Sequence, residues 1–219
     1  MPMKRVTLFA GHYGSGKTNL AVNFALDLHH KGYDVQIADL DIVNPYFRTK
    51  DSAEELAAAG IRLISPAYAN SNVDLPALPQ EVYGLVQNRS IYAIMDIGGD
   101  ERGALALGRY RPYILEENDF EMVFVVNFYR PLTRTAEEAI EVMREIEAAG
   151  GIPFTAIVNN SNIGEETTAD DVRATFAETE RLSQLTGLPV LFTGVKAELA
   201  AAFEGESILP LRLQKKMIN

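Results

Sequence analysis

Eight residues near the start of the chain have the types and the spacing of a phosphate-binding loop. They run from Gly11 to Thr18 and read GHYGSGKT, which fits the pattern G-x-x-x-x-G-K-[ST]. In such a loop the glycines let successive backbone N–H groups approach an anion, and the helix that follows adds about half a positive charge. We therefore expect the phosphates of a nucleotide to bind here.

The residue types give separate tasks to the side chains of this loop. Lys17 would reach the β- and γ-phosphates, and the Thr18 hydroxyl would hold Mg²⁺. His12 could donate a hydrogen bond to phosphate, or it could equally fill a position that faces solvent. The expected cofactor-binding residues of the loop are Gly11, His12, Tyr13, Gly14, Ser15, Gly16, Lys17, Thr18 and Asn19.

Carboxylates close two further apolar runs, at Asp39 and Asp41 and at Asp96. Asp96 has the position of a Walker B aspartate, which holds Mg²⁺ directly or through water, and the alternative is a helix cap or turn. Asp39 and Asp41 would share one face of an extended segment, as residues two apart do. One could join the metal shell and the other could orient the attacking water, and the alternative is a plain turn.

Apolar runs that alternate with helical stretches must position these residues. The predicted strands are 5–10, 34–39, 61–65, 91–96, 121–127, 154–159 and 189–193. The predicted helices are Asn19–His30, Asp51–Ala59, Glu81–Asn88, Thr135–Ala149 and Asp170–Leu185, with a loop before Glu81 and a Thr135/Glu138 capping box. This order predicts an α/β fold with a mostly parallel sheet and helices on both faces. Ligands bind at the carboxyl ends of such strands, where the loop and the carboxylates lie.

The composition excludes several classes of protein and of site. The 219 residues include no cysteine, so disulfides and thiolate-held zinc or iron–sulfur sites within this chain are excluded. The net charge of −10 argues against a nucleic-acid partner. We see neither a signal peptide nor a membrane span, and we expect a cytoplasmic protein with one domain, residues 1–219.

The combination of motifs resembles the CobQ/CobB/MinD/ParA family of nucleotide-binding proteins. The residues that carry the resemblance are the P-loop, Asp39-Leu40-Asp41, and residues 94–99, and it extends from Val6 to about Val195. The resemblance implies a three-layer P-loop NTPase fold with a mostly parallel sheet of seven or eight strands. It also implies ATP with Mg²⁺, and often an ATP-dependent face-to-face homodimer.

The resemblance assigns roles to the acidic residues. Asp41 takes the water-activating position, and Asp39 and Asp96 take positions in the metal shell beside Thr18. The expected catalytic residues are therefore Lys17, Asp41 and Asp39.

Two further positions bear on the base and on dimerisation. Asn159 matches the position that contacts adenine, with Asn160 as the alternative register. Many members of the MinD/ParA branch carry a lysine after the first loop glycine, which reaches the phosphates of the partner subunit. Here that position is His12.

Two functions of different classes fit these motifs. The first is a Mg²⁺-dependent ATPase that acts as a nucleotide switch on an unidentified protein partner, with residues 42–50 and 98–103 as the segments that respond to the γ-phosphate. The second is an ATP-dependent small-molecule enzyme that activates a carboxylate, as dethiobiotin synthetase does. Residues 44–50 and 127–134, which include Arg48, Arg130 and Arg134, could then bind an anionic substrate.

A third possibility is a regulator that binds nucleotide without turnover, which the presence of both Asp39 and Asp41 disfavours. The segment Asn159–Asn162 lacks the lysine and the aspartate of the guanine-reading motif Asn-Lys-x-Asp. The sequence therefore favours ATP over GTP.

Overall fold

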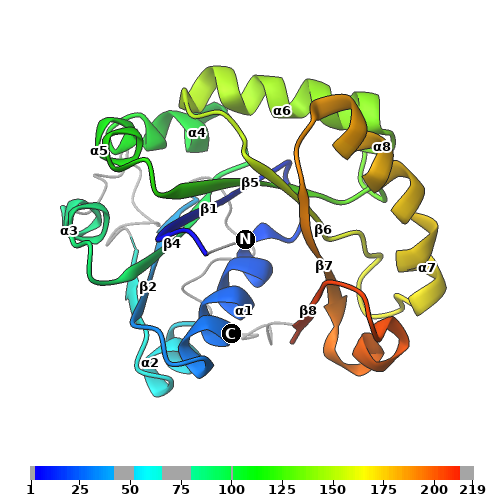
Figure 1. The fold of residues 1–219 in the computed structure, drawn as a ribbon, viewed down its shortest axis with the longest axis horizontal. Helices are drawn as coiled ribbons and strands as arrows, with labels where there is room; N and C mark the ends of the chain where they lie inside the picture. Colours follow the sequence, from blue (N-terminus) through cyan, green and yellow to red (C-terminus); the bar gives the residue numbers. More distant parts are fainter. Residues whose placement is uncertain (1–2, 42–51, 66–79, 100, 213–219) are drawn as a thin grey trace, which may run out of the picture.

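Figure 1 shows the computed structural model of the chain, which is built around one sheet. It describes residues 3–41, 52–65, 80–99 and 101–212. The strands are β1 (Val6–Ala10), β2 (Val35–Leu40), β3 (Arg62–Ile64), β4 (Tyr92–Ile97), β5 (Phe120–Val126), β6 (Ala156–Asn159), β7 (Val190–Lys196) and β8 (Ile208–Leu211).

The sheet is entirely parallel, with the strand order β3-β2-β4-β1-β5-β6-β7-β8. The predicted parallel α/β sheet of seven or eight strands is therefore confirmed. Each of the seven predicted runs overlaps one strand, with bounds that differ by up to three residues, but β8 was not predicted. Pro210 interrupts its pattern, and β8 tolerates this proline because, within the described residues, it is an edge strand that pairs with β7 alone.

The helices are α1 (Lys17–His30), α2 (Ala53–Ala58), α3 (Glu81–Gln87), α4 (Glu101–Leu107), α5 (Arg111–Glu117), α6 (Ala136–Gly150), α7 (Ala169–Ala174) and α8 (Phe176–Thr186), with the 3₁₀ segment η2 (Ala197–Phe203). Within the described ranges, no helix has the length and apolar character needed to cross a membrane. Helices α4 and α5 were not predicted.

The single helix predicted over Asp170–Leu185 is wrong, because the chain breaks at Thr175 into α7 and α8. The Thr175 hydroxyl donates to the Val172 carbonyl at 2.7 Å and accepts from Asn159 Nδ2 at 2.9 Å. These bonds tie the break to the end of β6.

The capping box predicted at the start of α6 forms only in part. Thr135 Oγ1 accepts from Glu138 N at 3.3 Å, as expected. The Glu138 carboxylate, however, accepts from the backbone N–H of Arg134 at 2.7 Å. The reciprocal bond is thus made one residue before the cap.

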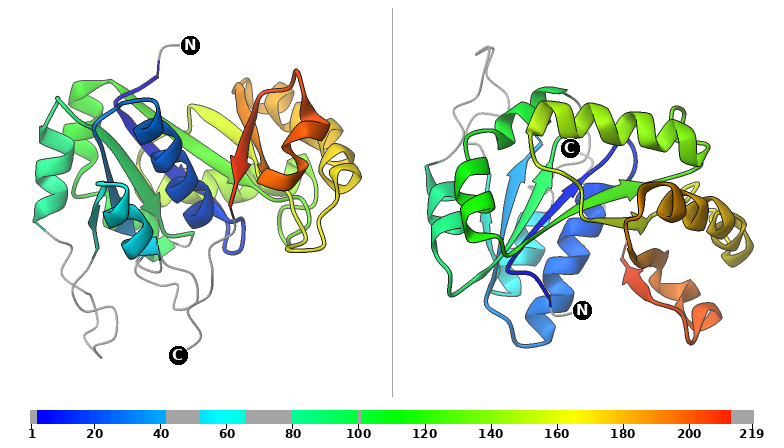
Figure 2. Two further views of the ribbon diagram at one scale, coloured as in Figure 1. Left: turned by 90° about the horizontal axis from the view of Figure 1, so that it is seen from below. Right: turned by 45° about the horizontal axis from the view of Figure 1, so that its top comes forward.

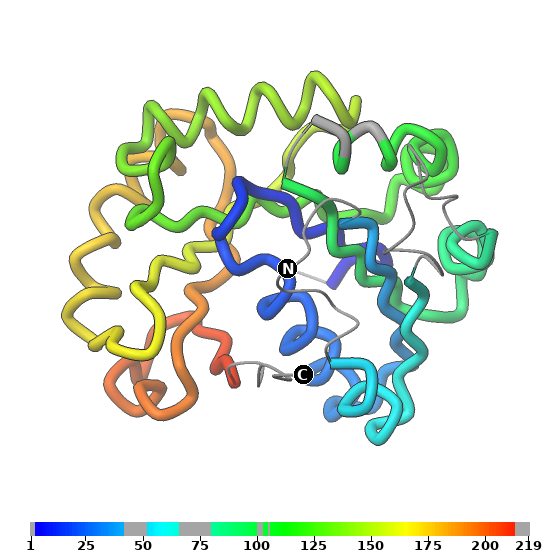
Figure 3. The backbone as a smooth tube through the Cα atoms, turned by 180° about the vertical axis from the view of Figure 1, so that it is seen from behind, coloured from blue at the N-terminus to red at the C-terminus, as the bar shows by residue number. Residues whose placement is uncertain are grey.

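Helices cover both faces of the sheet and form two large apolar clusters, and a third, smaller cluster contains Val172, Val195 and Phe203. Figures 1 and 2 show α1 and α2 on one face and α3, α4, α5 and α6 on the other. On the first face, Leu20 and Leu28 of α1 pack against Phe9 and Ile37. Figure 3 shows that β8, in red, comes back beside α1, in blue, where Leu211 joins the same cluster.

Candidate nucleotide-binding site

The loop between β1 and α1 contains two left-handed glycines. Gly14 has φ +79° and Gly16 has φ +82°, a region that L side chains rarely adopt. Gly16 is also the N-cap of α1, and no side chain of the described residues caps this helix. The first backbone N–H groups of α1 therefore face the loop, as in an anion-binding helix N-terminus.

Gly11 and Gly99 are needed for close packing around this loop. A Cβ atom on Gly11 would lie 2.2 Å from the carbonyl oxygen of Val125 on β5. A Cβ atom on Gly99, after β4, would lie 2.5 Å from the carbonyl oxygen of Gly11 and 2.9 Å from the backbone nitrogen of Tyr13. Gly11, which we expected to approach an anion, thus lets the loop approach β5.

The predicted second switch, residues 98–103, lies against the P-loop through Gly99. The helix α4 begins inside this segment, at Glu101, and a Cβ atom on Gly98 would lie 2.7 Å from the Cα atom of Gly103. Close contacts therefore require glycine at positions 98 and 99. The predicted first switch, residues 42–50, lies outside the described residues, as do Asp100 and most of the predicted loop before Glu81.

Lys17 is buried among three carboxylates. Its Nζ donates to Asp41 Oδ2 at 2.8 Å, and both side chains are 4% exposed. Burial lowers the pKa of Lys17, but the attraction of Asp96 and Asp41, with a smaller contribution from Asp39, outweighs it and raises the pKa above its ordinary value. Lys17 is therefore charged at neutral pH.

Asp39 and Asp96 are register partners on the adjacent strands β2 and β4. Neighbouring strands lie about 5 Å apart, so the two side chains occupy adjacent positions on one face. Asp39 Oδ1 also accepts from the backbone N–H of Asp41 at 3.0 Å, which closes a turn where β2 ends. The predicted extended segment thus ends at Leu40, and Asp39 belongs both to a turn and to the carboxylate cluster. No group of three or more His, Asp or Glu residues that could hold a metal is found in the described ranges.

A pocket of about 230 Å³ opens beside the loop. The predicted binding residues that line it are Gly14, Gly16, Lys17, Thr18, Asn19 and Asn160. Gly11, His12, Tyr13, Ser15 and Asn159 are not among its lining residues. The Nδ1 atom of His12 lies 3.0 Å from the carbonyl oxygen of Tyr13, and the Tyr13 side chain is largely exposed.

Asn160, the alternative register, is the asparagine that lines this pocket. Its Nδ2 donates to the Ser15 carbonyl at 2.7 Å, and its buried Oδ1 has no hydrogen-bond partner in the described part of the chain. The Asn159 side chain instead forms hydrogen bonds within the fold. Its Oδ1 accepts from Ser161 N at 3.0 Å, and its Nδ2 donates to Thr175.

The loop after β6 forms the far wall of the pocket and is braced by its own side chains. The Thr167 hydroxyl donates to the Gly164 carbonyl at 2.6 Å, and Asn162 Oδ1 accepts from Gly164 N at 3.2 Å. Lys196, at the end of β7, donates to the Glu165 carbonyl. Sequence reasoning missed Lys196 and Thr167, and only the run of short polar residues after Asn159 signalled this wall.

The described structure is similar to several solved proteins. It matches the cell division protein FtsY of Thermotoga maritima (TM-score 0.59, 15% identity, 89% of this chain and 63% of that one). It also matches FtsY of Mycoplasma mycoides, with a TM-score of 0.61 and 16% identity over 87% of this chain and 60% of that one. A third match is the signal recognition particle 54 kDa protein of Aeropyrum pernix in complex with GDP, with a TM-score of 0.55 and 20% identity over 88% of this chain and 42% of that one. The chain has a P-loop NTPase fold.

These similarities show the fold alone. The chain spans about three fifths or less of the length of the three solved structures. No protein-family model matches the chain, and no curated protein is significantly similar to it. The resemblance to the CobQ/CobB/MinD/ParA family is therefore not supported by a matched relative.

Proposed function

We propose that the protein is a Mg²⁺-dependent nucleotide hydrolase that binds ATP and acts as a nucleotide switch. The observation that carries the proposal is the position of Lys17, at the N-terminus of α1, in contact with Asp41 and close to Asp39 and Asp96. Backbone N–H groups that can donate to phosphate, a buried lysine and carboxylates thus meet at the carboxyl edge of one parallel sheet.

Phosphate binding would change the pairing of Lys17. A β- or γ-phosphate on the α1 N-terminus would compete with Asp41 for the Lys17 ammonium group. Asp41, released from that bond, would be a buried carboxylate able to orient or deprotonate water. The ion pair observed at 2.8 Å would then hold the catalytic carboxylate until nucleotide binds.

The residues present suit Mg²⁺. This cation is usually bound by one or two carboxylates together with substrate phosphates, so it does not need a cage of three protein carboxylates. Asp39, Asp96 and the Thr18 hydroxyl are the residues that would hold it, and the bound ion would neutralise charge on the phosphates.

The pocket favours adenine over guanine. Guanine presents N–H donors on its Watson–Crick edge, which a carboxylate satisfies well, and none of the described residues that line the pocket is acidic. The similar structure with GDP makes guanine the alternative to be tested.

Asp41→Asn is expected to lower the rate of ATP hydrolysis about 100-fold, because an amide cannot accept the proton of the attacking water. Mg²⁺-ATP should still bind, since the amide oxygen competes less strongly for Lys17. Phosphate release and equilibrium binding measure the two effects, with GTP assayed in parallel. Asp170→Asn is the matched control, because the Asp170 side chain is 94% exposed on α7. An unchanged rate would contradict the role of Asp41.

Light scattering of the Asp41→Asn protein with ATP, ADP or no nucleotide tests the switch. A dimer that forms only with ATP would support it and would show that His12 permits ATP-driven pairing. An unchanged mass in all three states would contradict the homodimer and favour the small-molecule enzyme.

A further inference from the structure

Arg130 lies directly on the phosphate loop, although it is 116 residues away in sequence. Its Nε donates to the Gly14 carbonyl at 3.0 Å. A Cβ atom on Gly14 would lie 3.6 Å from Nε and 3.9 Å from Cζ, so the guanidinium packs against the loop at this glycine. Arg130 lines the same pocket as Lys17 and Thr18.

The turn after β5 fixes the backbone of Arg130. Its N–H donates to the Asn127 carbonyl at 3.1 Å, and the Thr133 hydroxyl donates to the same carbonyl at 2.8 Å. Asn127 is fully buried, and its Oδ1 accepts from Tyr129 N at 3.0 Å. The arginine therefore extends over the loop from a rigid base.

This turn also contains a strained residue. Leu132 has φ +68°, in the left-handed region that a leucine rarely adopts, and its side chain is 62% exposed. Because most of the Leu132 side chain is exposed, the packing of this side chain does not explain the strain. Such strain persists where surrounding contacts determine the backbone, and here those contacts are the bonds that place Arg130 and Thr133.

The local charge favours a further cation beside the loop. Lys17 carries one positive charge but lies among Asp39, Asp41 and Asp96. Before Mg²⁺ binds, that cluster is net negative, which opposes a polyphosphate. Among the described residues, Arg130 forms no ion pair, and Nε is the only atom of its guanidinium in a hydrogen bond. Its two amino groups are thus available beside the pocket, in the planar arrangement that matches phosphate.

We infer that Arg130 contacts the polyphosphate of the bound nucleotide from within the same chain. The inference rests on the proposed function, because it names a further residue of the same site. Arg130 would offset the negative cluster around Lys17, and its Nε bond would keep it in register with the loop at Gly14.

Arg130→Gln is expected to weaken ADP and ATP binding about 10- to 100-fold, as for the loss of one charged hydrogen-bonding partner. Adenosine, followed by ligand-observed NMR, should bind both proteins equally, because it carries no phosphate. Arg130→Lys should recover most of the lost ADP affinity, since it keeps the positive charge. The matched control is Arg144→Gln, which removes the same charge from an exposed residue of α6 that does not line the pocket. Thermal unfolding of each variant checks that it is folded.

Several results would overturn the inference. Wild-type ADP affinity in Arg130→Gln would exclude a phosphate contact. Equal weakness in Arg130→Lys and Arg130→Gln would show that Arg130 acts by positioning Gly14. A parallel loss of adenosine binding would indicate damage to the whole pocket. If wild-type protein binds no nucleotide at all, the proposed function itself is wrong, and that result is distinct from a failure confined to Arg130.

Discussion

Lys17→Met is expected to reduce ATP and ADP affinity roughly 1,000-fold, the largest binding effect of any single substitution in this chain. Lys17 is the cation at the N-terminus of α1, and its removal leaves Asp39, Asp41 and Asp96 close to the incoming phosphates. The substitution therefore removes an attraction and exposes a repulsion. Isothermal titration with Mg²⁺-ADP measures the change.

A surface lysine provides the control. Lys31→Met removes one charge from the far end of the same helix, where Lys31 pairs with Asp27 and is 60% exposed. Its ADP affinity should equal that of the wild type. Tight ADP binding by Lys17→Met would contradict the assignment of the phosphate site to this loop.

The pH dependence of stability tests the environment of Lys17 without nucleotide. The pKa of Lys17 is raised in the folded protein, so its ion pairing stabilises the fold fully below the unfolded value of 10.5 and is lost as pH rises through the folded value. The difference in unfolding free energy between wild type and Lys17→Met should stay constant from neutral pH to about pH 9 and shrink above 10.5. Urea denaturation at a series of pH values measures it.

Local patterns made the centre of the fold and the phosphate loop predictable. Buried parallel strands are apolar throughout, so the runs that became β1, β2, β4 and β5 could be read from the sequence. The glycines of the loop mark a backbone that few other residues can adopt, as φ at Gly14 and Gly16 shows.

Features that depend on distant contacts were less predictable. The sequence left open whether Asn159 or Asn160 lines the pocket, because a shift of one residue moves a side chain to the other face of a strand. The strand end at Asn159 and its bond to Thr175 decide this register. The bond between Arg130 and Gly14 joins two turns that only the sheet order brings together.

The missed helices have a local reason. Residues 101–117 contain Gly103 and Gly108, which lower helix propensity, so the apolar spacing there was not read as helical. Gly103 nevertheless lies inside α4, and a Cβ atom at this position would lie 2.3 Å from the Cα atom of Gly98, so only glycine fits there. Pro112, at the start of α5, was the available signal, since proline favours the first turn of a helix.

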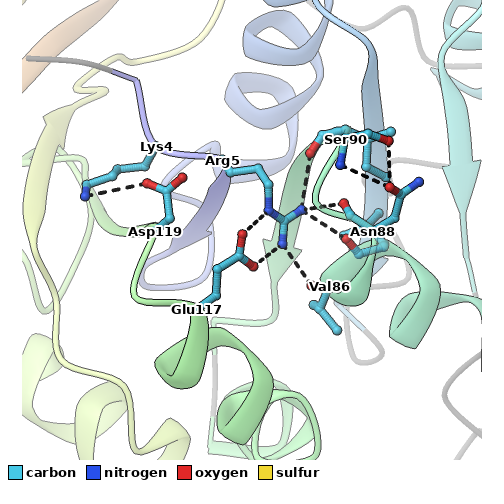
Figure 4. Close-up of polar contacts among 9 residues, drawn as sticks. Lys4, Arg5, Val86, Asn88, Ser90, Glu117 and Asp119 are labelled. Carbon is cyan, nitrogen blue, oxygen red and sulfur yellow. Dashed lines mark hydrogen bonds and ion pairs between the residues drawn. The ribbon is translucent and has the colours of Figure 1, made fainter.

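Arg5→Met is expected to lower the free energy of unfolding by about 3–5 kcal/mol, the largest stability effect of a substitution away from the pocket. Figure 4 shows the Arg5 guanidinium between Glu117 and the last turn of α3 with the residues that follow it. Nε and Nη2 donate to the Glu117 carboxylate, each at 2.5 Å, and the Arg5 residue is 6% exposed. The remaining donors reach four carbonyl oxygens, those of Leu85, Val86, Asn88 and Ile91.

The expected loss follows from what the substitution leaves behind. Methionine preserves the apolar stem of Arg5. It leaves the Glu117 carboxylate without its ion-pair partner, however, and the carbonyls at the end of α3 without a donor. Adding Glu117→Met should recover part of the loss, since it removes the uncompensated charge, while the carbonyls stay unpaired. Lys4→Met is the matched control, because Lys4 pairs with Asp119 at 3.6 Å on the surface and should contribute less than about 1 kcal/mol.

The position of Arg5 separates stability from function. Arg5 precedes β1, whereas the phosphate loop follows that strand, so the two lie at opposite ends of it. Folded Arg5→Met protein should therefore bind ADP with the wild-type affinity, while its urea midpoint falls. A loss of stability below about 1 kcal/mol would show that water replaces the guanidinium at little cost. A large loss of ADP affinity in the folded variant would show that the two ends of β1 are coupled. The nucleotide site would then depend on how Arg5 holds α3 and α5 at the opposite edge of the sheet.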